Sequence, residues 1–363
     1  MGGKKVAIIG GGVAGLEAAS SLAAFGIDIS LIEKEEHLGG HVSQWDRLFP
    51  SRRPAKEVTG HLTGRLNEKV TVHTGTEVQK IERSGKSWDI LLNNSATIVA
   101  DALLLATGFE LFEARKKEEY GYGIYDNVIT SADLEKKFAR DGEIRNAQGK
   151  IPERVGFVHC VGSRDEKVGN LYCSRVCCVT AVKQAVEVSE MIPGCEVFCF
   201  YMDLRMFGLD FEALYKESQE KWGVHFIRGR LSEAFENQDG SVLVKVEDTL
   251  AARPLKMKVD LLVLMSGMVT SSGTKKLVDM LGLETDENRF LQPADRQLRA
   301  NETGIPGLFL AGTCTSPKSI DETISDARAA ALRIMEYLNL PAPTLTPSPN
   351  WGRDGEGAGT NNQ

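Results

Sequence analysis

The chain has 363 residues, of which 42% are hydrophobic, and this is enough to form two packed domains. Its 43 Lys and Arg residues stand against 50 Asp and Glu residues, and the net charge of −7 leads us to expect no nucleic-acid partner. The sequence contains no stretch of about eighteen uncharged apolar residues, so we also expect no membrane span.

The first part of the sequence predicts a βαβ unit. Residues 6–10 form a short apolar run that is typical of a strand buried on both faces. The Ala-rich stretch 14–25 predicts a helix, and 27–33 predict a second strand that ends in an acidic residue. Residues 70–99 alternate in short segments between turn residues, which predicts a small antiparallel meander. Residues 102–108 return to the pattern of a buried strand.

The second part of the sequence predicts a further αβ unit, a last buried strand and a long helix. The expected strands are at 156–160, 196–202, 224–229, 260–267 and 307–312, and the expected helices are at 174–191, 211–222 and 320–338. Residues after 341 are rich in Pro, Gly and polar side chains and lack periodicity. We therefore expect residues 343–363 to be a disordered tail.

The first strand leads into a glycine motif. Gly10-Gly11-Gly12-Val13-Ala14-Gly15 matches G-x-G-x-x-G, in which glycine permits a tight turn and lets a pyrophosphate approach the helix N-terminus. Glu33, at the end of the second strand, is placed to accept hydrogen bonds from ribose hydroxyls. Such a motif alone is a weak indicator. Its position in a βαβ unit with an acid at the right distance favours a dinucleotide site over an ordinary glycine-rich turn.

Three further segments favour FAD over NAD as the dinucleotide. Gly39-Gly40 follows the second strand, ALLLATG at 102–108 precedes a change of domain, and GLFLAGT at 307–313 lies near the C-terminus. Each could be an ordinary strand-end turn, but their joint order resembles the thioredoxin-reductase-like flavoproteins, which have two dinucleotide-binding domains. The last motif of those proteins usually carries Asp where this chain has Thr313.

This resemblance implies an α/β fold with two Rossmann-like domains, the second of them modified. Residues 1–115 and 269–342 would form the FAD-binding domain, and residues 116–268 would form an inserted domain of the nicotinamide-binding type. The FAD-binding residues that the resemblance implies are Gly10, Gly12, Ala14, Gly15, Glu33, Lys34, Gly40, Val78, Thr107, Gly108, Gly312, Thr313, Lys318 and Ile320.

The second domain lacks the glycine turn that would hold a nicotinamide cofactor. The strand at 156–160 runs into VGSRDEKVGNLYCSRVCC, where only Gly162 remains near the turn and no second G-x-G-x-x-G occurs. The C-x-x-C dithiol of thioredoxin reductases is also missing. We therefore expect no NAD(P)H site of the usual kind.

Four of the seven cysteines lie within nineteen residues, in the pattern C-x12-C-x3-C-C. Thiolates hold both 4Fe-4S clusters and zinc, and the adjacent Cys177 and Cys178 favour the cluster because zinc sites usually draw on C-x-x-C pairs. Buried unmodified thiols are the alternative, and the expected state of Cys195, Cys199 and Cys314. The odd cysteine count and the lack of an export signal lead us to expect a reducing cytoplasm.

The cysteine pattern, residues 200–230 and the segment LFLAGTCTSPKSIDETISDARAAA at 308–331 together resemble the A-type subunit of heterodisulfide reductase over residues 4–340. The resemblance explains Thr313 and implies FAD, a 4Fe-4S cluster, a homodimer and further subunits of a complex as partners. The cluster ligands that it implies are Cys160, Cys173, Cys177 and Cys178.

The chain departs from the methanogen forms of this family because it has no ferredoxin-like cluster motif and no cysteine before residue 160. This short form is similar to the A-type subunit of the heterodisulfide-reductase-like complexes of sulfur-oxidising bacteria. That implies a subunit of cytoplasmic sulfur oxidation, which converts between two-electron flavin transfer and one-electron cluster transfer. The alternatives are an NAD(P)H-dependent flavoprotein disulfide reductase and an FAD-bearing scaffold with structural zinc.

Lys318 follows the last predicted flavin segment and is the one candidate catalytic residue. An ammonium group near the flavin would stabilise the anionic reduced form by Coulomb attraction. A solvated loop lysine is the alternative interpretation.

Overall fold

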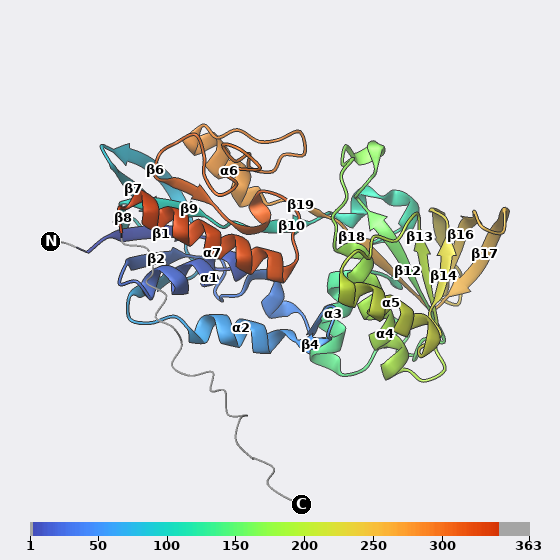
Figure 1. Cartoon of the computed structure of the whole chain (residues 1–363). Coiled ribbons are helices and arrows are strands. Elements are labelled where there is room, and N and C mark those ends of the chain that lie inside the picture. Colours follow the sequence, from blue (N-terminus) through green and yellow to red (C-terminus); the bar gives the residue numbers. More distant parts are fainter. Residues whose placement is uncertain (1–2, 341–363) are drawn as a thin grey trace, which may run out of the picture.

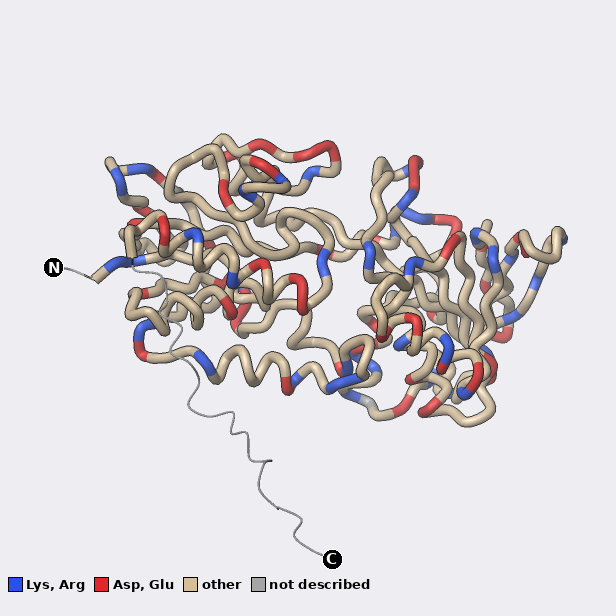
Figure 2. Tube along the Cα trace, viewed as in Figure 1, with Lys and Arg blue, Asp and Glu red and all other residues tan. Residues whose placement is uncertain are grey.

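The computed structural model describes residues 3–340, and the tail predicted at 343–363 lies outside them. Two α/β domains lie side by side and are joined through β10 (Phe109–Leu111) and β19 (Met268–Thr270), which pair antiparallel (Figure 1). In residues 3–340 no helix is long and apolar enough to cross a membrane. Basic and acidic residues are interspersed along both domains (Figure 2).

A five-stranded parallel sheet with the order β20-β9-β1-β2-β5 forms the centre of the first domain. Its strands are β1 (Lys5–Ile9), β2 (Asp28–Ile32), β5 (Val70–His73), β9 (Ala102–Leu105) and β20 (Leu308–Leu310). Helices α1 (Val13–Ala23), α2 (Ala55–Gly64) and α7 (Ile320–Tyr337) cover one face. The other face is covered by α6 (Ser272–Leu281) and by the meander of β6 (Val78–Ser84), β7 (Ser87–Leu92) and β8 (Thr97–Ala100).

The central strands of this sheet are buried on both faces. In β1, Val6 and Ile8 pack in the core under α1 and α7, whereas Ala7 and Ile9 pack in the core under the meander and α6. Successive side chains of a strand point to opposite faces, so a strand covered on both sides must be apolar throughout. This is why β1 reads as an unbroken apolar run.

The second domain repeats this plan with a parallel sheet of order β11-β18-β12-β13-β14. Its strands are β11 (Val128–Thr130), β12 (Arg154–Val161), β13 (Glu196–Tyr201), β14 (His225–Arg228) and β18 (Leu261–Ser266). Helices α3 (Ser131–Asp141), α4 (Cys177–Met191) and α5 (Leu209–Glu220) cover one face. An antiparallel sheet of β15 (Leu231–Glu236), β16 (Val242–Asp248) and β17 (Arg253–Val259) covers the other.

The predicted α/β fold with two Rossmann-like units is confirmed by these two sheets. All strands of the first sheet fall within 1–115 and 269–342, and all strands of the second fall within 116–268. A short hairpin of β3 (Arg47–Leu48) and β4 (Arg53–Pro54) extends from the first domain.

Two sequence-based assignments were wrong in detail. The meander predicted over 70–99 begins at β6, because β5 pairs in parallel with β2 and widens the main sheet. Gly75, with a φ of +57°, interrupts the extended chain between β5 and β6. The helix predicted from residue 174 begins at Cys177, because Arg175 has a left-handed φ of +62° that a right-handed helix does not accept.

The burial of β9 leads us to predict that shortening one of its side chains lowers the stability of the protein. Leu104 is fully buried under α1 and α7, and we expect Leu104→Ala to lower the free energy of unfolding by about 2–5 kcal/mol through lost burial and a residual cavity. Leu332→Ala is the control, because Leu332 on α7 is 52% exposed and should cost at most about 0.5 kcal/mol. Urea unfolding measures both, and equal losses would contradict the assignment of Leu104 to the core.

Candidate functional site

A cavity lies between the two domains and is lined by residues of both. The first domain contributes the turn after β1, the end of β2, the segment 37–49, the turn after β9 and residues around 318. The second domain contributes the beginnings of α3 and α4 and the end of β18. Ligands of open parallel sheets bind outside the carboxyl ends of the strands, and this cavity borders those ends in both sheets.

Most residues predicted to bind FAD line this cavity. They are Gly10, Gly12, Ala14, Glu33, Lys34, Gly40, Thr107, Gly108, Thr313, Lys318 and Ile320. Gly15, Val78 and Gly312 do not line it. Val78 belongs to β6 and packs against the meander core instead. A Cβ atom on Gly15 would lie 1.8 Å from the Gly10 carbonyl oxygen, so Gly15 serves the contact of α1 with its own turn.

Gly10 and Gly12 of the glycine motif are needed for different reasons. Gly10 has a φ of +111°, and a Cβ atom there would lie 2.3 Å from the carbonyl oxygen of Ala106. Gly12 has a φ of −78°, and a Cβ atom there would meet nothing within 4 Å. The fold therefore needs glycine at Gly10, whereas Gly12 leaves open space before the N-terminus of α1. Open space at a helix N-terminus suits a pyrophosphate, so the turn fits a dinucleotide.

Glu33 holds the glycine turn as well as facing the cavity. It is 7% exposed, its Oε2 accepts a 2.6 Å hydrogen bond from Gly11 N, and its Oε1 accepts one of 2.9 Å from Glu35 N. A carboxylate has about four acceptor positions, so lone pairs remain for ribose hydroxyls. The predicted role of Glu33 is compatible with this geometry.

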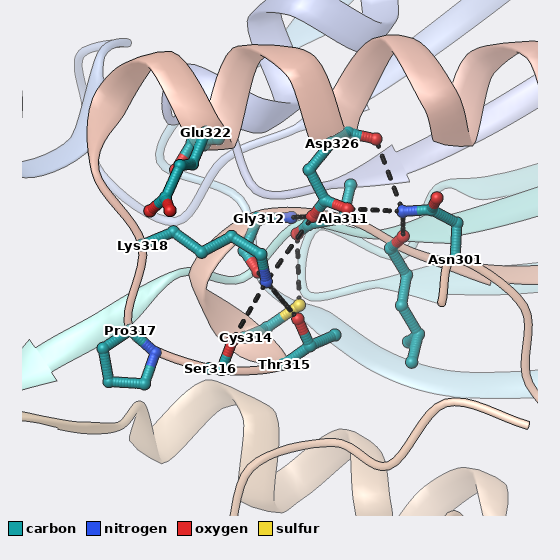
Figure 3. Close-up of polar contacts among 12 residues, drawn as sticks. Asn301, Ala311, Gly312, Cys314, Thr315, Ser316, Pro317, Lys318, Glu322 and Asp326 are labelled. Atoms are coloured by element: carbon teal, nitrogen blue, oxygen red, sulfur yellow. Dashed lines mark hydrogen bonds and ion pairs between the residues drawn. The ribbon is translucent and has the colours of Figure 1, made fainter. Parts of the chain in front are cut away.

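Lys318 lines the cavity with its ammonium group held by the chain itself (Figure 3). Its Nζ donates to the Gly312 carbonyl oxygen at 3.0 Å and to hydroxyls of the 312–316 segment, and it lies 3.6 Å from Asp326 Oδ2. The same Asp326 oxygen accepts a 2.7 Å hydrogen bond from Gly312 N. Asp326 on α7 therefore places a carboxylate at the turn of Gly312 and Thr313. In the flavoproteins that this chain resembles, the Asp in the position of Thr313 places a carboxylate at the same turn.

An aromatic wall of the cavity was missed by the sequence analysis. The His41 ring lies 4.6 Å from the Phe109 ring and 6.4 Å from the Trp45 ring, measured between centroids. His41 Nε2 also lies 2.9 Å from the Phe109 carbonyl oxygen. Such a wall suits a flat ring system. Its residues come from irregular segments, and aromatic residues soon after Gly39-Gly40 were the only signal in the sequence.

Three of the four predicted cluster cysteines come together beneath the cavity. Cys160 is the second-last residue of β12, and Cys177 and Cys178 begin α4; all three are buried. Cys177 also lines the cavity. Cys173 is half-buried, its sulfur accepts a 3.3 Å hydrogen bond from Arg175 N, and it lines a separate surface pocket.

The three buried thiols shift one another's pKa values. Hydrogen bonding from Cys177 lowers the pKa of Cys160 and lowers that of Cys178 to about 4. The pKa of Cys177 is raised well above its ordinary value because it hydrogen-bonds to both neighbours. A helix N-terminus stabilises negative charge, so the start of α4 is a favourable place for thiolates.

His159, next to Cys160, adds to this environment. Against the effect of burial, the sulfurs of Cys178 and Cys199 raise the pKa of His159 to about 10. Neither ring nitrogen has a hydrogen-bond partner of good geometry. A buried N–H beside thiolates is the kind of donor that tunes an iron–sulfur cluster, and thiolates are the ligands that such a cluster takes.

The backbone of the cysteine segment is strained. Cys160, Arg164 and Arg175 have φ values of +58°, +52° and +62°, in the left-handed region that disfavours residues with a side chain. Each such residue costs about 1–3 kcal/mol unless the surrounding structure imposes it, and such residues concentrate at functional sites. The chain thus departs from regular geometry where the thiols are brought together.

The segment from β12 to α4 occupies the position of a glycine turn. Gly162 has a φ of +75°, and a Cβ atom there would lie 2.0 Å from the ring of Phe112. The ring of Phe112 therefore fills the space beside the one glycine that remains.

Among residues 3–340, no three His, Cys, Asp or Glu side chains are in position to hold a metal ion. The iron–sulfur cluster is therefore a proposal that rests on the proximity of the thiols.

Comparisons with known proteins agree with the fold. A family model described as pyridine nucleotide-disulphide oxidoreductase matches residues 4–331. The A-type subunit of the H2:CoB-CoM heterodisulfide,ferredoxin reductase of Methanothermobacter thermautotrophicus is 42% identical over 241 residues, which are 65% of this chain and 37% of that protein. The A-type iron-sulfur subunit of the CoB–CoM heterodisulfide reductase of Methanocaldococcus jannaschii is 31% identical, over 90% of this chain and 63% of that protein.

The thioredoxin reductase of T. acidophilum has the same fold, with a TM-score of 0.65, 19% identity, and coverage of 93% of this chain and 99% of that one. The fold is therefore that of the thioredoxin-reductase-like class. The chain belongs to the pyridine nucleotide-disulphide oxidoreductase family, so it is an oxidoreductase for which FAD is the implied cofactor. The predicted similarity to the A-type subunit of heterodisulfide reductase is confirmed, and the chain spans between 37% and 63% of the length of these two curated relatives.

The contrast between two glycines gives a prediction for FAD. We expect Gly12→Val to leave the fold intact and to weaken FAD binding at least about tenfold, because the new side chain enters the space before α1. FAD titration of the apoprotein measures this affinity, and thermal unfolding of the apoprotein measures the fold.

Gly15→Ala is the matched control, since its Cβ atom would meet the Gly10 carbonyl oxygen and lower the stability of the apoprotein itself. A Gly12→Val protein that binds FAD as tightly as the original would show that the space before α1 is not the pyrophosphate site.

Proposed function

We propose that the chain is an FAD and 4Fe-4S electron-transfer subunit of a heterodisulfide-reductase-like complex. The observation that carries the proposal is that Cys177, one of three buried thiols in mutual contact, lines the same cavity as the glycine turn of the first domain. The similarity to the two methanogen proteins supports it, because both are subunits of heterodisulfide reductases.

When bound, FAD would handle electrons in pairs and the cluster would handle them singly, so together they convert between the two kinds of transfer. The chain supplies the means of holding both groups. Gly12 leaves room for the pyrophosphate, Glu33 has free lone pairs for the ribose, and the wall at His41 suits the ring. Cys160, Cys173, Cys177 and Cys178 would hold the cluster.

The chain also controls the charge around the cluster. Against the effect of burial, the pKa of Arg164 is raised mainly by Asp203, with which it forms an ion pair, and to a smaller extent by the charges of Cys160 and Cys173. Arg175 links the cysteine segment to the first domain, since its guanidinium donates to Glu322 at 2.6 Å and to the Pro317 carbonyl oxygen at 3.0 Å. Both arginines would offset thiolate charge, and Arg175 also holds the cysteine segment against the first domain.

A role in cytoplasmic sulfur oxidation is a further proposal, made on the similarity to the complexes of sulfur-oxidising bacteria. A homodimer and additional subunits of the complex are proposed as partners on the same ground. The alternative of an NAD(P)H-dependent disulfide reductase has less support, since Phe112 fills the space beside Gly162 in the second glycine position. Rapid bleaching of the flavin by NADH alone would favour that alternative.

The cluster is tested by the composition of protein purified without oxygen. We expect flavin bands over a broad cluster absorption, with about four iron and four sulfide per chain. In Cys177→Ala the iron and the broad absorption should fall at least twofold, because one ligand is removed. Cys195→Ala is the control, since Cys195 lies at the other end of α4 and is half-buried. Zinc without iron, or an unchanged Cys177→Ala spectrum, would contradict the proposal.

The role of Lys318 is tested by the flavin potential. Removing its charge should destabilise the anionic reduced flavin, so we expect Lys318→Ala to lower the midpoint potential by tens of millivolts, on the order of 1 kcal/mol for two electrons. Lys275→Ala is the control, because Lys275 is an exposed residue of α6 in the same domain. Equal potentials in the two variants would show that the ammonium acts only on the turn at Gly312.

A further inference from the structure

A buried polar cluster lies at the end of the cavity that the second domain forms. Glu135 comes from α3, Lys183 and Gln184 are adjacent residues of α4, and Glu187 lies one turn further along α4. Their exposed fractions are 4%, 1%, 0% and 3%. Glu135, Lys183 and Gln184 line the cavity, whereas Glu187 lies behind Lys183. Neither the glycine motif nor the cysteine segment includes any of them.

The cluster has two carboxylates for one ammonium group. Lys183 Nζ forms an ion pair with Glu135 Oε1 and lies 3.0 Å from Glu187 Oε2. Arg47, which lies outside these two helices, also lowers the pKa of Glu187 by its charge. The guanidinium of Arg47 is itself paired with Glu190 at 3.2 Å and with Asp46 at 3.7 Å. With every group ionised, the three buried side chains carry one uncompensated negative charge.

The buried polar cluster of α3 and α4 also has too few hydrogen-bond donors. Glu135 is well supplied, because its Oε1 accepts from Lys183 and from Gln184 Nε2 at 2.7 Å, and its Oε2 accepts from Asp46 N at 3.0 Å. Oε1 of Glu187 and Oε1 of Gln184 are buried without a hydrogen bond, and Oε2 of Glu187 has only the ion pair with Lys183, which lacks hydrogen-bond geometry. Buried acceptors rarely lack a donor, and one added proton would remove the excess charge and supply a donor.

We propose that Glu135, Lys183 and Glu187 form a proton-binding site of the cavity, with Glu187 as the group that gains and loses the proton. The proposal deepens the proposed function and rests on it, because two-electron reduction of a bound flavin to its singly protonated anion consumes one proton. A one-electron reductant such as dithionite would supply the two electrons, and the Glu187 carboxyl group would release the proton and become a carboxylate. Solvent protons then restore the carboxyl group.

The local electrostatics place this exchange near neutral pH. Burial, opposed by Lys183 and reinforced by Glu135, raises the pKa of Glu187 to about 7. A carboxyl group with a raised pKa stabilises the fold fully below its ordinary pKa, and this stability is lost as the pH rises through the folded pKa. The folding equilibrium constant should therefore fall on the order of a hundredfold between about pH 4.5 and pH 7 through this group alone.

The first test uses the apoprotein. Infrared titration should show one protonated carboxyl band that disappears with a midpoint near pH 7 and is missing in Glu187→Gln. Glu190→Gln is the matched control, one turn further along α4 and 41% exposed in its side chain, and it should keep the band. Lys183→Met should move the midpoint upward, because the neighbouring cation is lost. A Glu187→Gln protein that retains the band, or an original protein without one, would overturn the proposal.

The second test uses the protein loaded with flavin. Proton uptake on reduction, followed with an indicator dye in weak buffer, should slow about tenfold in Glu187→Gln and stay unchanged in Glu190→Gln. Equal rates would overturn the role in the cavity even if the carboxyl band is found. If the protein binds FAD and iron but shows no such carboxyl band, only the proton-binding proposal is contradicted. If the band is present but the protein binds no FAD or iron, only the proposed function is contradicted.

Discussion

Burial of both faces of the two parallel sheets is the constraint on which the rest of the structure depends. Residues 6–9 of β1 and all residues of β9 are apolar, because helices cover one face of the sheet and the meander and α6 cover the other. Polar chemistry is thereby excluded from the sheets and moved to the segments that follow the strands. The glycine turn follows β1, the cysteine segment leads from the end of β12 to α4, and the buried polar cluster lies within α3 and α4, the helices that follow β11 and the cysteine segment. The cavity forms where these segments of both domains meet.

The two domains use the same strand–turn–helix position for different chemistry. After β1 the turn is open, since Gly12 leaves space before α1 for a phosphate. After β12 the corresponding segment is longer, has left-handed residues such as Cys160 and Arg175, and brings thiols to the start of α4. A helix N-terminus stabilises a phosphate and a thiolate by the same partial charge. A fold that binds two dinucleotides can therefore bind one dinucleotide and a thiolate-held group without a change in its core.

The features that could be predicted from the sequence were short apolar strands followed directly by a glycine turn. The strand at 6–10 and the glycines after it were assigned correctly, because a buried strand and a tight turn each restrict the residue types at particular positions. The assignment failed for β5, whose short alternating sequence allows either a meander or the edge of the main sheet. Only pairing with β2, a contact distant in sequence, decides between them. The aromatic wall at His41 was missed for the same reason, since its partner Phe109 lies 68 residues away.

The sequence by itself determined the fold class, the glycine turn and the similarity to the A-type subunit of heterodisulfide reductase, because each depends on residue types at short fixed spacings. Tertiary structure alone decided which side chains share an environment. It placed Asp326 at the turn of Gly312, joined Glu135 of α3 to Lys183 and Glu187 of α4, and buried that cluster without enough hydrogen-bond donors. Charge balance and hydrogen-bond supply are properties of a volume in space, and residues that are distant in the chain reach the same volume only when both sheets and their helices are packed.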